Sequence, residues 1–171
     1  AGVDINAETA WAIATGAGGM VAVLDSGVDS DHPDLDVVVG WDYVGRDEDS
    51  NPDMGTDEGP HGTAAAGLAA ATGDNGLGVA GVAYDAQVYG IRLLGGDTTL
   101  TDFYDAFVEA VDAGAWVLSN SRGFGDDCPD IPIYSTFEEA FAYAEDHGRG
   151  GLGTAIVVAA GNGGCDNSNG G

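Results

Sequence analysis

The sequence predicts an α/β protein built on a doubly wound, mainly parallel sheet with helices on both faces. Short apolar runs bounded by glycine, such as 21–24 and 154–162, are typical of strands that are covered on both faces of a parallel sheet. Segments with helical spacing of apolar residues alternate with these runs, as expected for crossover helices. No internal repeat or linker divides residues 1–171, which predicts a single unit.

The first half of the chain is expected to supply two strands and two helices. Asn6 is expected to cap a helix that ends at Gly16, and a glycine-rich link then leads into the strand 21–24. A second apolar run covers 36–43. Residues 61–73 are almost wholly Ala and Gly, which predicts a helix that is hydrophobic all round and runs through the interior.

The second half continues the alternation of strand and helix. One helix with apolar spacing ends at Gly114. Ser135 and Glu138 form a capping box for another helix, which ends at Gly148. The strand regions expected in this half are 78–84 with 86–94, then 115–121 and 154–162.

The charge of the chain is extreme. It has 29 Asp and Glu residues against 4 Lys and Arg residues, which gives a formal net charge of −25. Such an excess repels itself at low ionic strength and is screened at molar salt, so we expect a high-salt habitat. The balance argues against nucleic acid or an anionic membrane surface as partner and favours cationic substrates.

Other sequence signals bound the class of protein. No apolar run is long enough for a membrane span, and the first residues lack the layout of a signal peptide. The glycine-rich link precedes its strand, whereas a dinucleotide fingerprint follows one, so nucleotide binding is weakly supported. Cys128 and Cys165 follow successive core strands, and a disulfide or two free thiols are both open.

Three polar residues stand at the ends of apolar elements. Asp25 follows the strand 21–24, His61 begins the Ala-rich helix, and Asn162 closes the run 154–162. An acid that orients an imidazole is what a hydroxyl nucleophile needs, and an amide donor suits an oxyanion. From its position alone, Asp25 is equally consistent with a turn cap.

The segments VAVLDSGVDSDHPDL, HGTAAAGLAAA and VVAAGNGG resemble the Asp, His and oxyanion Asn motifs of the subtilisin-like serine proteases. The resemblance implies that Asp25 is the orienting acid, His61 the general base and acid, and Asn162 the oxyanion donor. The family's G-T-S-x-A-x-P segment with the catalytic serine has no counterpart here. The resemblance therefore implies the amino-terminal part of a catalytic domain, incomplete at its C-terminal end and inactive alone.

Within that family, WDYVGRDEDSNPD and SNSRGFGDD are similar to segments of the kexin-type proprotein-processing branch. The likeness implies a secreted, extracellular enzyme that cleaves polypeptides after basic residues, with Asp126 near the first specificity pocket and Glu58 at the second. Ser26 and Arg122 depart from the branch, which usually has Asp and Trp there. The implied substrate-binding residues are Glu58, Ser119, Gly123 and Asp126.

The resemblance also implies calcium, a cation that takes carboxylate, amide and carbonyl oxygens. One site would use Asp34 and Asn75 with the carbonyls of Thr72, Leu77 and Val79. A second would use Asp42, Asp47 and Asp49, and a third Asp126 with Asp166. Chance clustering is the alternative in so acidic a chain.

Two functions remain in competition. The first is a secreted, halophile-like serine endopeptidase that hydrolyses polypeptides through an Asp-His-Ser triad. The second is a non-catalytic calcium-binding domain that reuses the fold.

Overall fold

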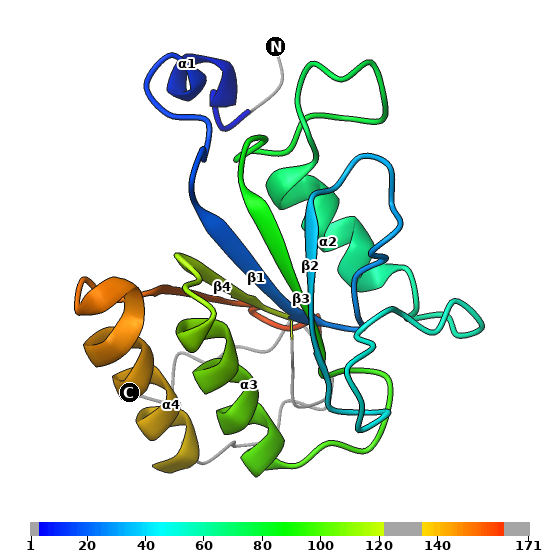
Figure 1. Ribbon diagram of the computed structural model, residues 1–171, viewed down its shortest axis with the longest axis vertical. Coiled ribbons are helices and arrows are strands. Elements are labelled where there is room, and N and C mark those ends of the chain that lie inside the picture. Colours follow the sequence, from blue (N-terminus) through cyan, green and yellow to red (C-terminus); the bar gives the residue numbers. More distant parts are fainter. Residues whose placement is uncertain (1–3, 122–134, 163–171) are drawn as a thin grey trace.

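A computed structural model describes residues 4–121 and 135–162 of the chain. Within these residues, five strands form one sheet in the order β2-β3-β1-β4-β5, and every pairing is parallel (Figure 1). The strands are β1 Met20–Asp25, β2 Val37–Asp42, β3 Gln87–Arg92, β4 Val117–Asn120 and β5 Ala155–Val158. The predicted class, α/β with a parallel sheet, is confirmed.

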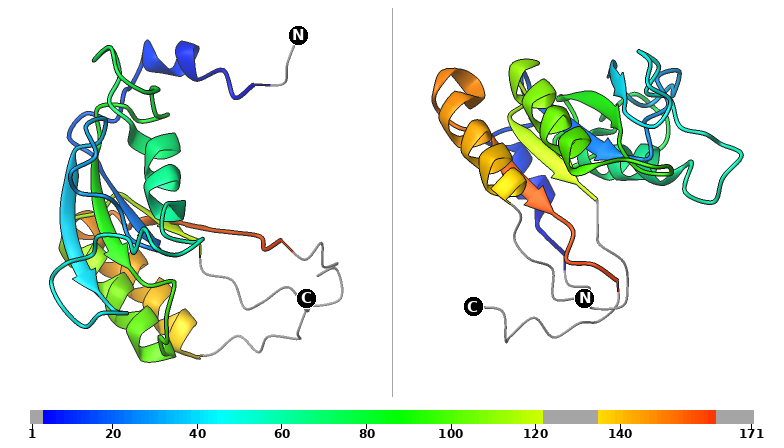
Figure 2. Two further views of the ribbon diagram at one scale, coloured as in Figure 1. Left: turned by 90° about the vertical axis from the view of Figure 1, so that its right-hand side faces the viewer. Right: turned by 90° about the horizontal axis from the view of Figure 1, so that it is seen from below.

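Three of the four described α-helices cover the two faces of this sheet. The four are α1 Ala7–Trp11, α2 His61–Ala70, α3 Leu100–Asp112 and α4 Ser135–His147, followed by a short 3-10 turn, Gly148–Gly150. Helix α2 lies on one face, and α3 and α4 lie side by side on the other (Figure 2). Because all crossovers carry the chain back to the same edge, the carboxyl ends of the strands gather there.

The core has two layers, one on each side of the sheet. Alternation along β1 sends Val21 and Val23 toward Ala66 of α2. The alternate residues Ala22 and Leu24 face the other way, where they join Phe103 and other buried residues that pack with α3 and α4. Both faces of the central strand are therefore buried, which explains its uninterrupted apolar sequence.

The expectation that Asn6 caps the first helix is wrong. Asn6 adopts a left-handed backbone with φ of 56°, and its side chain makes no capping hydrogen bond. An N-cap normally has an extended backbone, which aims its oxygen at the amides of the first turn. The Asn6 Oδ1 instead accepts from the hydroxyl of Thr9, and α1 ends at Trp11 rather than Gly16.

Three further elements differ from the sequence prediction. Helix α2 buries only one side, and Leu68 on its other side is 75% exposed. No strand forms over 78–84, because backbone amides of this segment donate to carbonyls at the end of α2. The predicted buried strand at 154–162 is the four-residue β5, in which Val157 is 57% exposed. For α2 and β5, a layer that would cover the exposed side is absent from the described residues.

Candidate active site

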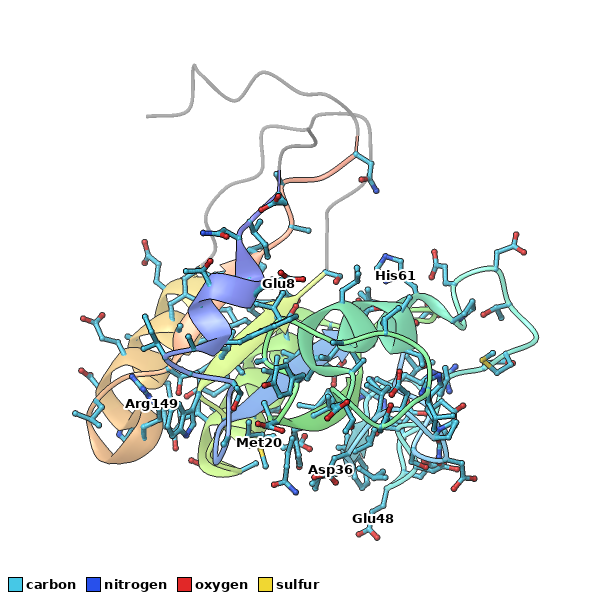
Figure 3. All side chains as sticks on the ribbon, turned by 90° about the horizontal axis from the view of Figure 1, so that it is seen from above. Glu8, Met20, Asp36, Glu48, His61 and Arg149 are labelled. Carbon is cyan, nitrogen blue, oxygen red and sulfur yellow. The ribbon has the colours of Figure 1, made fainter. Side chains whose placement is uncertain are left out.

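Asp25 and His61 form a hydrogen-bonded pair at the carboxyl edge of the sheet. Asp25 ends β1 with a fully buried side chain, and His61 is the first residue of α2. The His61 Nδ1 lies 2.7 Å from the Asp25 Oδ1. An ionised carboxylate can only accept, so Nδ1 carries the proton and Nε2 is left to act as a base. The imidazole projects from the start of α2 and is 60% exposed (Figure 3).

The first turn of α2 can approach β1 this closely because of Gly62. A Cβ at this position would lie 2.2 Å from the carbonyl oxygen of Gly27 and 3.0 Å from the Cβ of Asp25. Any larger residue would push the helix, and with it His61, away from Asp25. Glycine is therefore required for the pairing.

Ser26 fixes the same turn with hydrogen bonds. Its buried hydroxyl accepts from the Gly62 amide at 3.0 Å and donates to the Gly59 carbonyl at 3.2 Å. Its own amide donates to the Asp25 Oδ1 at 2.6 Å. Ser26 thus ties the acid and the helix of the base to one turn, a role that sequence reasoning missed. The only sequence signal was its place beside Asp25.

The pair opens into a cavity of about 420 Å³. Glu58 and Asn162 both lie on its wall, so the sequence-predicted amide donor and one predicted substrate-binding acid share a cavity with the dyad. Ser119 is in β4, half-buried and in register with Val23, and it does not line this cavity. Gly123 and Asp126 lie outside the described residues. Among the described residues, the cavity is lined by Asp25, Ser26, Glu58, His61, Leu93, Leu94, Gly95, Gly96, Thr98, Ser121 and Asn162.

This arrangement is suited to proton transfer beside a polar cleft. An imidazole with one nitrogen held by a carboxylate can accept a proton at the other and return it to a leaving group. An amide side chain on the same wall can donate to an oxygen that gains negative charge.

The predicted first calcium site is a compact cluster around the buried Asp34. Its Oδ1 accepts from the Asn75 side-chain amide at 2.7 Å, and its Oδ2 accepts from the Val79 amide at 3.1 Å. Its carbonyl accepts from the Thr72 amide at 2.9 Å, and the Leu77 amide donates to the Asn75 Oδ1. The five predicted residues therefore lie together, and their carboxylate, amide and carbonyl oxygens are the donors that calcium prefers.

The residues of the predicted second calcium site have other partners. The carboxylate of Asp42 accepts from the amides of two following residues and from Arg92 Nη1 at 3.0 Å. Asp47 and Asp49 each accept from the amide two positions further on. In the described ranges, no three His, Cys, Asp or Glu side chains group as metal ligands. Asp166 of the third site and both cysteines, Cys128 and Cys165, lie outside the described residues.

Sequence reasoning also missed a polar centre on the α3 side of the sheet. Glu109 accepts hydrogen bonds from the Trp41 amide and from the hydroxyls of Tyr43 and Tyr89, at 2.8 to 2.9 Å. Burial, reinforced by Glu109, raises the pKa of both tyrosines. These residues line a second, open cavity of about 700 Å³. A lone Glu in an amphipathic helix gives no sequence signal of this kind.

Among the helices of the described residues, none combines the length and the apolar character needed to cross a bilayer.

Comparison with known proteins places this geometry in a family. The chain is 40% identical over 164 residues to thermitase of Thermoactinomyces vulgaris, covering 94% of this chain and 53% of thermitase. It is 40% identical to bovine (Bos taurus) furin, covering 94% of this chain and 21% of furin. The crystal structure of MycP1 with its N-terminal propeptide removed superposes with a TM-score of 0.75 at 29% identity, covering 95% of this chain and 48% of that one.

The chain thus spans about half the length of thermitase and less of furin. The model of the subtilase family, peptidase S8, matches residues 16–171. Given this match and the identity to thermitase and furin, the chain belongs to the subtilase family.

Proposed function

We propose that this chain is the amino-terminal part of the catalytic domain of a serine endopeptidase. The observation that carries the proposal is the 2.7 Å contact between the His61 Nδ1 and the buried Asp25. It couples a general base to its orienting acid beside a cavity that also contains an amide donor, Asn162. The subtilase match supports the same reaction class.

In the proposed reaction, His61 Nε2 takes the proton of a serine hydroxyl supplied by the remainder of the protein. The hydroxyl oxygen then attacks the peptide carbonyl, and Asn162 donates to the resulting oxyanion. His61 returns the proton to the leaving amine while Asp25 stabilises the imidazolium. In the second half of the reaction, His61 takes a proton from a water molecule, and the water oxygen attacks the acyl group and releases it from the serine. Residues 1–171 alone are proposed to be inactive, since triad members act as a unit.

The proposed substrate is a polypeptide, with a preference for basic residues. Glu58 supplies a carboxylate on the cavity wall, and the surrounding chain carries a net charge of −25. A cationic side chain would therefore be attracted to the cleft and pair with Glu58. The kinship to furin supports this preference.

The test uses the intact protein at high salt and a serine-directed phosphonate with a basic side chain. The intact protein is expected to be labelled covalently, and the His61→Ala variant is expected to lose labelling. A matched phosphonate with an apolar side chain reports on the basic preference. If the intact wild-type protein stays unlabelled by both reagents, the endopeptidase proposal is wrong. That result would favour the alternative, a non-catalytic calcium-binding domain.

We further propose that the protein is secreted into a saline medium and binds calcium at the cluster of Asp34 and Asn75. The acidic composition supports the saline habitat, and the buried Asp34 carboxylate with Asn75 beside it supports the ion. Detection of the protein in the culture medium, rather than in the cell fraction, tests secretion.

A further inference from the structure

Two buried side-chain atoms in the described part of the chain have no hydrogen-bond partner: Asp25 Oδ2 and Arg92 Nε. One is an acceptor and the other is a donor. They belong to residues that are register partners on the neighbouring strands β1 and β3. Buried polar atoms without partners are rare in folded proteins, so two complementary ones on paired residues call for a common explanation.

The sheet directs both side chains to the same region. Register partners on adjacent parallel strands project to the same face, and the strands are about 4.8 Å apart. Arg92 is also anchored at its far end, because Nη1 donates to the Asp42 carboxylate at 3.0 Å and both side chains are largely buried. The position of Nε is therefore fixed. The Asp25 and Arg92 side chains form no direct ion pair in the described structure.

We propose that Arg92 is a positioning residue for Asp25, and that its Nε–H reaches the Asp25 Oδ2 through one buried water molecule. A water between two such atoms satisfies both. The Asp25 Oδ1 is already occupied by His61 and by the Ser26 amide. Holding Oδ2 as well fixes the rotation of the carboxylate, and with it the orientation of the His61 ring.

With this water bridge, the charged network extends beyond the dyad. It links Asp42, Arg92, Asp25 and His61 in one line across three strands and the start of α2. In the part of the chain that the structure describes, the cavity wall has one more charged side chain besides those of the dyad, that of Glu58. The catalytic meaning of this line rests on the proposed function, but its geometry can be tested without any activity.

The test follows the His61 Nδ1 proton by NMR in the chain itself. The Asp42→Asn variant keeps the Arg92 guanidinium and serves as the matched control. The double variant Arg92→Met with Asp42→Asn removes the cation and its partner together, so no charge is left buried alone. Relative to the control, the double variant is expected to exchange this proton with solvent about tenfold faster, as for loss of one hydrogen bond to a charged group.

A high-resolution crystal structure of the wild-type chain is expected to show an ordered water within hydrogen-bond distance of both atoms. Equal exchange rates in the double variant and the control would overturn the positioning role. Density that pairs either atom with a different protein group would overturn the bridge. Neither outcome bears on whether the intact protein is labelled by a phosphonate, so the two proposals fail independently.

Discussion

Arg46 and Asp102 form a bidentate ion pair that joins the loop after β2 to the start of α3. Both terminal nitrogens of the guanidinium contact the carboxylate, Nη2 to Oδ2 at 3.0 Å. The same carboxylate accepts from the Thr99 amide, while the Thr99 hydroxyl accepts from the Asp102 amide, which completes a capping box. One side chain thus caps a helix and anchors an acidic loop.

At neutral pH, the Asp102→Asn variant is expected to have a lower free energy of unfolding than the wild type. In acid, this difference in the free energy of unfolding is expected to be smaller. The Arg46 hydrogen bond holds the pKa of Asp102 well below its usual range. A lowered folded-state pKa stabilises the protein above the unfolded pKa of about 3.9, and this contribution is lost as the pH falls below that value. Urea unfolding at a series of pH values measures the difference.

The Asp105→Asn variant is the control for Asp102, because it removes the same charge from an exposed position on the same helix. Its difference from the wild type is expected to stay nearly constant between pH 7 and the acid range. If the free energy of unfolding falls with pH equally in the wild type and in Asp102→Asn across the acid range, the lowered pKa of Asp102 is contradicted.

The sequence predicted what depends on local patterns. The apolar run before Asp25 identified the central strand, and the motif around His61 identified the helix that carries the base, because burial and helical packing act over a few residues. Asp25 and Asn162 were both predicted to follow strands, and parallel strands end at one edge of the sheet, which agrees with the cavity that they line together with His61.

What the sequence could not predict depends on contacts between distant segments. Ser26 binds residues 33 and 36 positions away, and Arg92 pairs with an aspartate 50 positions away. Neither contact corresponds to a periodic pattern of residues in the sequence. The exposed β5 was misjudged as buried because its apolar composition matches a core strand, whereas its exposure depends on which neighbour is present.

The Glu109→Ala variant is expected to be destabilised by about 2 to 4 kcal/mol, because three donors lose their acceptor. Glu109→Gln retains an acceptor oxygen and is expected to lose less. Glu48→Gln is the control, since Glu48 lines the same cavity at an exposed position. Urea unfolding near neutral pH measures all three. A loss for Glu109→Ala no larger than that of Glu48→Gln would show that the hydrogen bonds are not made in solution.

The Ser26→Ala variant is expected to lose about 1 to 3 kcal/mol of unfolding free energy, because the Gly62 amide and the Gly59 carbonyl are left buried without the hydroxyl. Loosening of this turn should also broaden the His61 ring resonances in NMR spectra. Ser30→Ala, a partly exposed position in the following loop, is the control. Unchanged His61 resonances in Ser26→Ala would argue that the turn is held by the glycine contacts alone.

The stability of the chain is expected to increase with sodium chloride concentration. The net charge of −25 repels itself, and the Debye length falls from about 10 Å at 0.1 M to about 3 Å at 1 M. Thermal unfolding followed by circular dichroism between these concentrations measures the effect, with sucrose at matched osmolality as the uncharged control. An equal rise in sucrose would attribute the gain to solvent exclusion rather than screening.

Calcium is expected to raise the unfolding temperature of the wild-type chain and to have little effect on the Asp34→Asn variant. Asp34 is buried, and its two oxygens bond to Asn75 and to the Val79 amide, so the loop is already closed around the carboxylate. An ion bound only by the folded state adds about 2.7 kcal/mol at 100 times its dissociation constant. Asp36→Asn removes the same charge from an exposed neighbour and should respond like the wild type. Magnesium separates the specific effect from general screening, because it demands a tighter octahedral shell. If calcium shifts the unfolding temperature equally in Asp34→Asn and Asp36→Asn, or if calcium and magnesium shift it equally, the calcium effect does not arise at this loop.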